Sequence, residues 1–340
     1  MFKYEIINLL KIKGENRKKK EVFTMRQPTQ GIHHITAFVQ NAQKTVDFYA
    51  GVLGLRLVKK TINFDAPEVY HLYFGNEIGK PGTIITFFPW ENSRKGRIGG
   101  GQVGITTYVV PQNSLDFWRR RLERFQVKTT EQVRFKEKYL QFKDPDGLQL
   151  EIVERENGEN SNWTFGDVSV DKAIKGFGGA VLYSTKPEKT AQTLGNVMGL
   201  KRVGMEGSFI RFQATGEIGN IIDIDQSVTY AGLGGAGTVH HIAWRAKSDE
   251  EHVLWREHVE QSGYHPTTII DRQYFHAIYF REDGEILFEI ATDPPGFAND
   301  EPAEHLGEKL MLPAWFEQYR KGIEEGLPKI EVRSPEEEVQ

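Results

Sequence analysis

Two histidine pairs and one downstream glutamate have residue types and positions that could bind a metal. The pairs are His33–His34 and His240–His241, and each begins a run of β-branched and aromatic residues that predicts a strand. Glu289 lies in a third such run, EILFEIATD. Two imidazoles and one carboxylate can bind Fe(II) on one face and leave positions open for a substrate and O2. The spacing therefore predicts a metal site of two histidines and one glutamate.

Only one member of each histidine pair is expected to face a shared cavity squarely, because successive side chains of a strand point to opposite sides. His276 lies in a predicted strand but belongs to no motif. The remaining histidines stand alone, and we interpret them as surface or packing residues: His71, His252, His258, His265 and His305.

One pattern of a strand, a helix and three strands occurs four times, in residues 33–90, 102–154, 178–227 and 239–293. The helices are predicted at 42–54, 114–125, 187–200 and 248–263, the last with Ser248 as its N-cap and Glu251 as capping-box partner. A βαβββ module leaves one face of its sheet uncovered, so two modules can wrap around a shared cavity. Four modules predict an α+β fold of two half-barrel pairs.

The candidate ligands lie in the first and fourth modules, so the metal cavity is expected to join the two ends of the chain. The third module opens with GGAVLYS and has no histidine there. The second module places Glu151 where Glu289 lies in the fourth, but no histidine accompanies it. We therefore interpret Glu151 as a remnant of duplication and not as a second site.

The polar, turn-rich stretch near 155–175 predicts a linker between two domains. The first domain would span 31–155 and contain modules one and two. The second would span 175–295 and contain modules three and four. Residues 296–340 would form a C-terminal extension.

The first 24 residues differ from the rest of the chain. They carry seven Lys or Arg and three Glu, a net charge of +4, which leaves −8 for residues 25–340. Their basic cluster follows an apolar stretch, the reverse of a signal peptide. Lys20, Glu21 and Val22 can be encoded by a bacterial ribosome-binding sequence, and Met25 follows at the spacing of a start codon. We expect translation to begin at Met25 and residues 1–24 to be a non-native or disordered leader, with a basic tail as the alternative.

The composition is typical of a soluble globular protein, with 39% hydrophobic residues and 34 glycines among 340. A formal charge of −4 gives no reason to expect nucleic acid or an anionic membrane as a partner. No apolar run approaches the roughly 20 residues of a membrane helix. The chain has no cysteine, so nothing indicates an oxidising compartment and the cytoplasm is expected. The sequence leaves a homo-oligomer open.

Four segments, in order, resemble the vicinal oxygen chelate superfamily: GIHHIT, YHLYFGNEIGKPGTIITFFPW, VHHIAW and LFEIATDPPGF. The resemblance runs from about Gly31 to Trp315. It is closer to the ring-cleaving dioxygenase branch, with the MhqO-like proteins and the hydroquinone 1,2-dioxygenases. This branch implies a mononuclear Fe(II) site, with Mn(II) as the alternative metal. It also implies that O2 opens the ring of a small aromatic diol, a hydroquinone or a catechol.

The resemblance also implies roles for individual residues. The second histidine of each pair would be the ligand, so His34 and His241 would bind the metal together with Glu289. Three further residues, beside the ligands, would belong to the active site: His33, His240 and Thr36.

Two more residues match active-site positions of the ring-cleaving branch. Arg272 lies seventeen residues before Glu289, and Tyr279 lies ten residues before it. An arginine can hold a phenolate through charge-assisted hydrogen bonds. A tyrosine hydroxyl can orient the substrate and relay a proton.

Two alternatives remain beside the dioxygenase. Glyoxalase-type relatives use four protein ligands, which include one carboxylate from each of the two paired modules. Here the first module offers only Thr86 or Phe87 at the position of its carboxylate. Three ligands leave room for a phenolate and O2, which disfavours a glyoxalase or epimerase on Zn, Ni or Mn. A non-catalytic resistance protein that sequesters an aromatic compound is disfavoured because such a pocket needs no iron.

Overall fold

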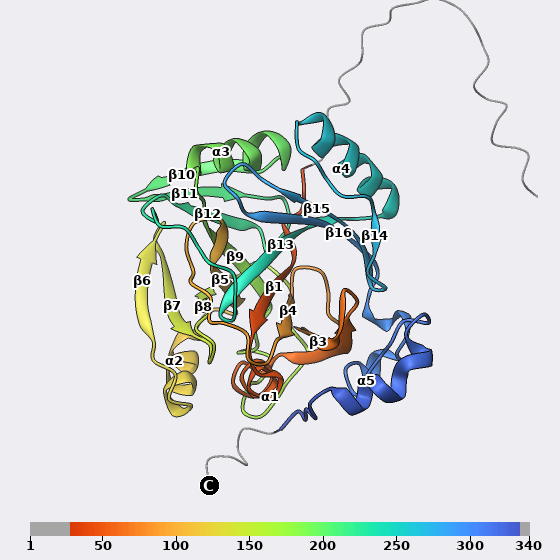
Figure 1. Ribbon diagram of the computed structural model, residues 1–340. Coiled ribbons are helices and arrows are strands. Elements are labelled where there is room, and N and C mark those ends of the chain that lie inside the picture. Colours follow the sequence, from red (N-terminus) through yellow and green to blue (C-terminus); the bar gives the residue numbers. More distant parts are fainter. Residues whose placement is uncertain (1–27, 334–340) are drawn as a thin grey trace, which may run out of the picture.

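The computed structural model describes residues 28–333, in which two curved eight-stranded sheets pack against each other (Figure 1). We call the sheet formed by the first and fourth modules the outer-module sheet. Its strands are β1 (Ile32–Val39), β2 (Arg56–Asn63), β3 (Ala66–Gly75), β4 (Ile84–Pro89), β13 (Thr238–Ala246), β14 (Ile270–Asp271), β15 (Phe275–Arg281) and β16 (Leu287–Pro295).

The second and third modules form the inner-module sheet. Its strands are β5 (Gln102–Val110), β6 (Thr130–Arg134), β7 (Glu137–Lys143), β8 (Gln149–Glu154), β9 (Gly176–Tyr183), β10 (Lys201–Glu206), β11 (Phe209–Gln213) and β12 (Ile221–Asp225). The strand orders are β14-β15-β16-β13-β1-β4-β3-β2 and β10-β11-β12-β9-β5-β8-β7-β6. The two sheets therefore share one topology.

An antiparallel pair lies at the centre of each sheet, β1 with β13 in one and β5 with β9 in the other. On each side, the first strand of a module pairs in parallel with its last strand. The predicted α+β fold of four βαβββ modules is confirmed. The metal-candidate modules meet as expected, since the first pairs with the fourth. Each sheet takes strands from both sides of the 155–175 stretch, and the division into two domains there stays a prediction.

Each module begins its helix after its first strand. The helical segments are α1 (Ala42–Val46), continued by the π-helical turn η1 (Asp47–Val52), α2 (Leu115–Arg124), α3 (Pro187–Gln192), continued by η2 (Thr193–Val197), and α4 (Asp249–Gln261). Ser248 caps α4 as predicted, because its hydroxyl accepts a hydrogen bond from the backbone N–H of Glu251. The Glu251 carboxylate accepts from the backbone N–H of Lys247, one residue before the position that a capping box requires.

The second strand of the fourth module is short, since only Ile270–Asp271 pairs as β14. Gln273 has a φ of 70° and ends the extended run in a turn. In this turn the backbone N–H of Arg272 donates to the carbonyl of Phe275. The turn precedes β15, and Arg272 lies in it.

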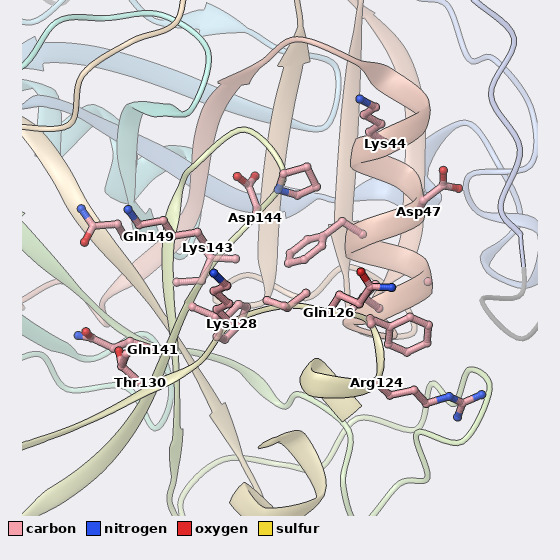
Figure 2. A pocket seen from close by; sticks show the side chains of 18 of the residues that line it. Lys44, Asp47, Arg124, Gln126, Lys128, Thr130, Gln141, Lys143, Asp144 and Gln149 are labelled. Atoms are coloured by element: carbon pink, nitrogen blue, oxygen red, sulfur yellow. The ribbon is translucent and has the colours of Figure 1, made fainter. Parts of the chain in front are cut away.

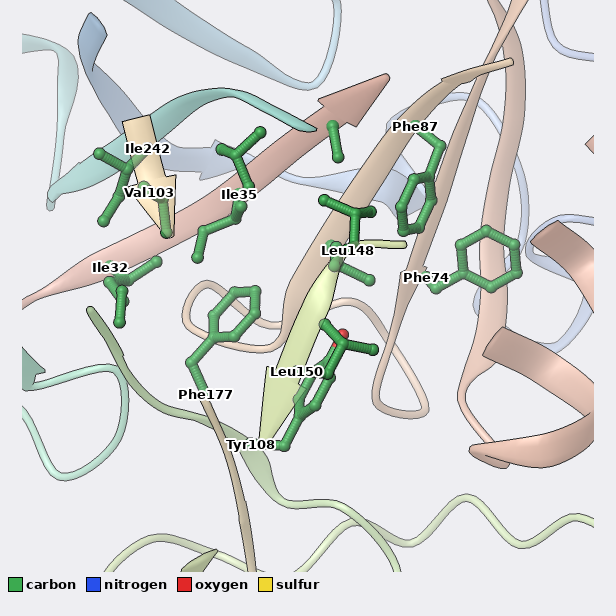
Figure 3. Packing of buried hydrophobic residues seen from close by; sticks show 14 of the residues in the cluster. Ile32, Ile35, Phe74, Phe87, Val103, Tyr108, Leu148, Leu150, Phe177 and Ile242 are labelled. Atoms are coloured by element: carbon green, nitrogen blue, oxygen red, sulfur yellow. The ribbon is translucent and has the colours of Figure 1, made fainter. Parts of the chain in front are cut away.

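The hydrophobic core lies between the two sheets. Ile35 and Ile242 from the outer-module sheet approach Val103, Tyr108 and Phe177 from the inner-module sheet (Figure 3). Side chains alternate along β1, so Ile35 and Ala37 are buried away from the face that carries His34 and Thr36. The packing fixes which face of each strand is left for chemistry.

Residues 296–333 pack on the outer-module sheet. They contain three short helical turns and one helix: η3 (Phe297–Asn299), η4 (Ala303–His305), η5 (Glu317–Tyr319) and α5 (Arg320–Gly326). The buried Lys59 ammonium donates to the carboxylates of Asp300 and Glu301, 2.7 Å from each. This pair of ionic contacts anchors the start of the extension to β2.

The leader expected at residues 1–24, the start at Met25 and the acidic end at 334–340 lie outside the described residues. Within residues 28–333, no helix is both long enough and apolar enough to cross a membrane.

Candidate metal centre

Three ligand atoms converge on the concave face of the outer-module sheet. His34 lies on β1, His241 on β13 and Glu289 on β16, three strands that neighbour one another in the sheet. One ligand atom from each residue lies within 4.8 Å of the other two, and all three residues are buried. The structure thus brings together the three residues that the sequence proposes as ligands.

The three ligand atoms that face each other are all electron-pair donors, which can bind a cation. Nε2 of His34 lies 3.2 Å from Nε2 of His241, and these atoms lie 3.3 and 2.8 Å from Oε2 of Glu289. Within the described chain, neither carboxylate oxygen of Glu289 has a well-formed hydrogen bond. Buried polar atoms normally have partners, so this convergence fits a metal ion.

The histidine pairs explain how Nε2 of each ligand is left free. Nδ1 of His34 lies 2.9 Å from Nδ1 of His33, and Nδ1 of His241 lies 2.8 Å from Nδ1 of His240. If each ligand donates its Nδ1 hydrogen to its neighbour, its Nε2 is an acceptor and can bind a metal.

The neighbours can accept because their rings are neutral. Burial lowers the pKa of His33 well below its usual range, and the nearby His34 adds to this. His240 is more exposed than His33, but desolvation by the surrounding residues, together with the nearby His241, lowers its pKa to about 3. Burial would raise the pKa of Glu289, yet the two imidazoles hold it well below its usual range.

A cavity of about 260 Å³ opens beside the ligands. His34 and His241 line it, whereas Glu289 is completely buried and does not. Much of the rest of the wall is aromatic: Phe38, Phe64, Tyr73, Phe88, Trp90, Phe275 and Tyr279. Pockets for drug-sized ligands are roughly 300–1,000 Å³, so this cavity suits one small ring.

Arg272 and Tyr279 both lie on the cavity wall, as their proposed roles require. Nε of Arg272 donates to the Tyr279 hydroxyl at 3.2 Å, and Nη1 donates to the carboxylate of Asp65 at 3.0 Å. Burial raises the pKa of Tyr279, and Glu289 raises it further, so the phenol is protonated. Asp65 was not anticipated from the sequence, and it fixes the direction in which Arg272 points.

Both members of the second histidine pair reach the cavity, whereas only His34 of the first pair does. The expectation that a single member faces inward therefore describes the first pair and not the second. His33 lies behind His34, packed near Phe275.

His71, interpreted as a surface or packing residue, packs against Tyr73 and Phe88 but also lines the cavity. Nδ1 of His71 lies 2.8 Å from the Tyr73 hydroxyl, and Nε2 of His71 lies 2.8 Å from the Thr86 hydroxyl.

Thr36, proposed as an active-site residue, is fully buried and does not line the cavity. Its hydroxyl lies 2.8 Å from that of Thr86.

Two of the other single histidines have backbone partners. His252 is buried and lies 2.8 Å from the carbonyl of Ile290, and His258 lies 3.0 Å from that of Val197. His276, which had no assignment, forms a contact of 2.6 Å with Asp249 at the protein surface.

A larger hollow of about 1110 Å³ lies elsewhere, between η1 and the β7–β8 region (Figure 2). Its labelled polar residues include Lys44, Arg124, Lys128 and Lys143, which gives it a basic lining. None of the residues around it is a histidine. The histidine ligands, Arg272 and Tyr279 all line the smaller cavity.

The fold and the site identify the class of protein. Residues 31–152 match the family model described as Glyoxalase/Bleomycin resistance protein/Dioxygenase superfamily. The chain is 61% identical over 309 residues to a Bacillus subtilis protein named "Putative ring-cleaving dioxygenase MhqO", covering 91% of this chain and 99% of that protein. The chain belongs to this superfamily.

Two further comparisons agree with that placement. The chain is 35% identical over 297 residues to the chlorohydroquinone/hydroquinone 1,2-dioxygenase of Sphingobium indicum, covering 83% of this chain and 91% of that protein. A crystal structure titled as a "putative dioxygenase" from Bacillus subtilis has 61% sequence identity and a TM-score of 0.90. It covers 91% of this chain and 99% of that one.

Proposed function

We propose that this protein is an Fe(II)-dependent dioxygenase that opens the aromatic ring of a hydroquinone or catechol with O2. The observation that carries the proposal is the convergence of His34, His241 and Glu289 beside a small aromatic cavity. The similarity to a hydroquinone 1,2-dioxygenase supports the substrate class.

The charges of the site suit a phenolate. Histidines bind a metal in their neutral form, so the two imidazoles and one carboxylate would supply a single negative charge, and a site that holds a divalent ion would retain positive charge for an anionic oxygen. The Arg272 guanidinium, tied to Tyr279 and Asp65, adds a fixed cation at the wall. Bound Fe(II) would supply open positions and the electrons that O2 chemistry requires.

The remaining residues would bind and orient the ring and control its protons. Phe88 and Phe275 present aromatic surface to a flat ring. The protonated hydroxyl of Tyr279 can donate a hydrogen bond to a substrate oxygen in the cavity. His33 and His240 would hold the ligand imidazoles in the metal-binding tautomer, and their loss should reduce turnover more than metal content.

We place this activity in the cytoplasm, because a chain without cysteine has no disulfide that would call for an oxidising compartment.

The test is metal analysis of protein purified without air, followed by O2 uptake with a panel of hydroquinones and catechols. We expect iron at close to one per chain, O2 consumption and loss of the aromatic absorbance. The variants His34→Ala, His241→Ala and Glu289→Ala should lose iron and activity together, with His276→Ala as a surface control. Isomerisation without O2 uptake would favour a glyoxalase, and tight binding without turnover a sequestering protein.

A further inference from the structure

The four modules place four equivalent side chains on the concave faces of the sheets. In each module the first and last strands pair in parallel, and the paired residues are Thr36 with Thr86, Thr107 with Glu151, Val181 with Asp223, and Ala243 with Glu289. The register makes Thr86, Glu151, Asp223 and Glu289 structural equivalents. Three of these four residues are acidic, and only the first module has a neutral side chain.

The neighbouring strand supports the same alignment. The residues opposite these four positions are Tyr73, Gln141, Arg211 and Tyr279, in module order. Thr86 and Glu289 thus each lie opposite a tyrosine in the outer-module sheet. This register selects Thr86, not Phe87, as the first module's counterpart of the metal-ligating glutamate.

The Thr86 hydroxyl is held from two sides. Oγ1 of Thr36 and Nε2 of His71 each lie 2.8 Å from it. Nδ1 of His71 is in turn held by the Tyr73 hydroxyl at 2.8 Å. A hydroxyl has one hydrogen and two acceptor positions, so these two partners occupy two of its three hydrogen-bonding positions.

We propose that Thr86 keeps the fourth metal-ligand position free, and that His71 is the positioning residue that holds Thr86 in this state. The inference rests on the metal site of the proposed function. A carboxylate at position 86 would approach the ion from the first module as Glu289 does from the fourth. A threonine whose hydroxyl is bonded to His71 and Thr36 leaves that coordination position to the substrate or O2.

His71 is suited to this task because it is neutral and fixed. Burial lowers its pKa well below the usual range, so the ring adds no positive charge beside a metal cation. Its ring packs 4.0 Å from that of Tyr73 and 4.4 Å from that of Phe88, measured between centroids. The same ring forms part of the cavity wall, which couples the position of Thr86 to the space for the substrate.

The first test changes the ligand number. Thr86→Asp and Thr86→Glu should bind Co(II) more tightly by about ten-fold or more in competition with a chelator, because affinity rises with the number of charged ligands. Thr86→Val should stay within about two-fold of the natural protein. Asp223 shows that this fold accepts an aspartate at the equivalent position. Unchanged Co(II) affinity in both acidic variants, with the fold confirmed by circular dichroism, would overturn the proposal.

The acidic variants should also exclude the substrate. Anaerobic titration of Co(II)-loaded protein with hydroquinone should show a spectral change in the natural protein and in Thr86→Val, and none in Thr86→Glu. A Thr86→Glu protein that still binds hydroquinone at the metal would contradict an occupied fourth position.

The second test asks whether His71 acts through Thr86. His71→Leu should alter the visible spectrum of the Co(II)-loaded protein, whereas His71→Gln, which keeps hydrogen-bonding groups, should restore most of it. In a Thr86→Val background, His71→Leu should cause no further change, since the group that it positions is gone. His276→Leu is the matched control. Equal effects of His71→Leu in both backgrounds would assign it a packing role only.

These readouts separate the inference from the dioxygenase proposal. If the natural protein binds Co(II) through His34, His241 and Glu289 but opens no ring, the activity is wrong and the role of Thr86 is still tested. If His34→Ala leaves Co(II) affinity unchanged, the metal site itself fails, and the inference fails with it.

Discussion

The outer-module and inner-module sheets have the same strand order, but different groups surround the acidic side chains on their concave faces. The register places Ile105 and Gly179 in the inner-module sheet where His34 and His241 lie in the outer-module sheet. The inner-module sheet nevertheless keeps two buried acids, Glu151 and Asp223.

Two arginines neutralise these acids. Both Nη atoms of Arg134 donate to the Glu151 carboxylate, Nη1 at 3.0 Å, and Nε donates to Asp223 at 2.8 Å. Nε and Nη2 of Arg211 donate to the two Asp223 oxygens at 2.7 and 2.8 Å. Glu151 also accepts from Thr107 and Gln141.

The difference shows what a metal would contribute in this fold. The inner-module sheet closes its concave face with side-chain cations, so its acids are satisfied and no ligand atom is left over. The outer-module sheet has ligand atoms and no arginine bonded to Glu289. The interpretation of Glu151 as a remnant of duplication stays a prediction, and its present contacts give it a structural role.

The largest contrast should come from removing the equivalent acids one at a time. Glu289→Ala should abolish metal binding and leave the fold intact, because metal-free Glu289 has no well-formed hydrogen bond to lose. Glu151→Ala should retain the metal but cost about 3–5 kcal/mol of stability, because it leaves a buried Arg134 without its main partner. Metal content and denaturant unfolding of the metal-free proteins measure both. Equal losses of stability in the two variants would break the comparison.

The next contrast sets Tyr279, which lies opposite Glu289, against a buried tyrosine of the inner-module sheet, Tyr183. Tyr279→Phe should lower turnover by roughly ten- to a thousand-fold with little change in metal content, because it removes only a hydroxyl that positions a proton. Tyr183→Phe, in the inner-module sheet, is the control and should leave turnover unchanged. Rates are measured at saturating hydroquinone across the pH range. Natural turnover in Tyr279→Phe would leave this tyrosine a wall residue.

A smaller effect is expected when the ion pair of the inner-module sheet is replaced as a whole. The double variant Arg134→Met, Glu151→Leu should recover most of the stability lost by Glu151→Ala, to within about 1–2 kcal/mol of the natural protein. Asp223 keeps its two bonds to Arg211 in this variant. Denaturant unfolding provides the measurement. A double variant no more stable than Glu151→Ala would show that the charges themselves are needed there.

The smallest effect lies at the junction of the two sheets. Asp144, in the turn between β7 and β8, accepts from the Tyr49 hydroxyl of η1 at 3.1 Å, and burial raises its pKa to about 7. A raised pKa in the folded state means that this group favours folding at low pH and loses that contribution as the pH rises from about 4 to about 8.

Asp144→Asn removes this titration while its amide oxygen can still accept from the turn. The difference in unfolding temperature between the variant and the natural protein should therefore move in the variant's favour as the pH rises through this range. Thermal unfolding at several pH values measures it. A constant difference would show that Asp144 does not titrate in this way.

Local sequence was sufficient for much of the fold and for the candidate ligands. Strand and helix periodicity predicted four modules, because each βαβββ unit is written in contiguous residues. Ser248 could be predicted as a cap since its partner lies three residues away. The histidine pairs and Glu289 could be chosen because their chemistry is rare and their order along the chain matches a known family.

Tertiary structure decided what depends on strands that are far apart in the chain. The second strand of the fourth module is only Ile270–Asp271, and the turn that follows it directs Arg272 onto Tyr279 and Asp65. Thr86 could be separated from Phe87 only by the register of β4 against β1. His71 became a cavity residue only when β3 placed it beside Thr86. The arginines that satisfy Glu151 and Asp223 come from separate modules, and no local pattern records which distant carboxylate a side chain will meet.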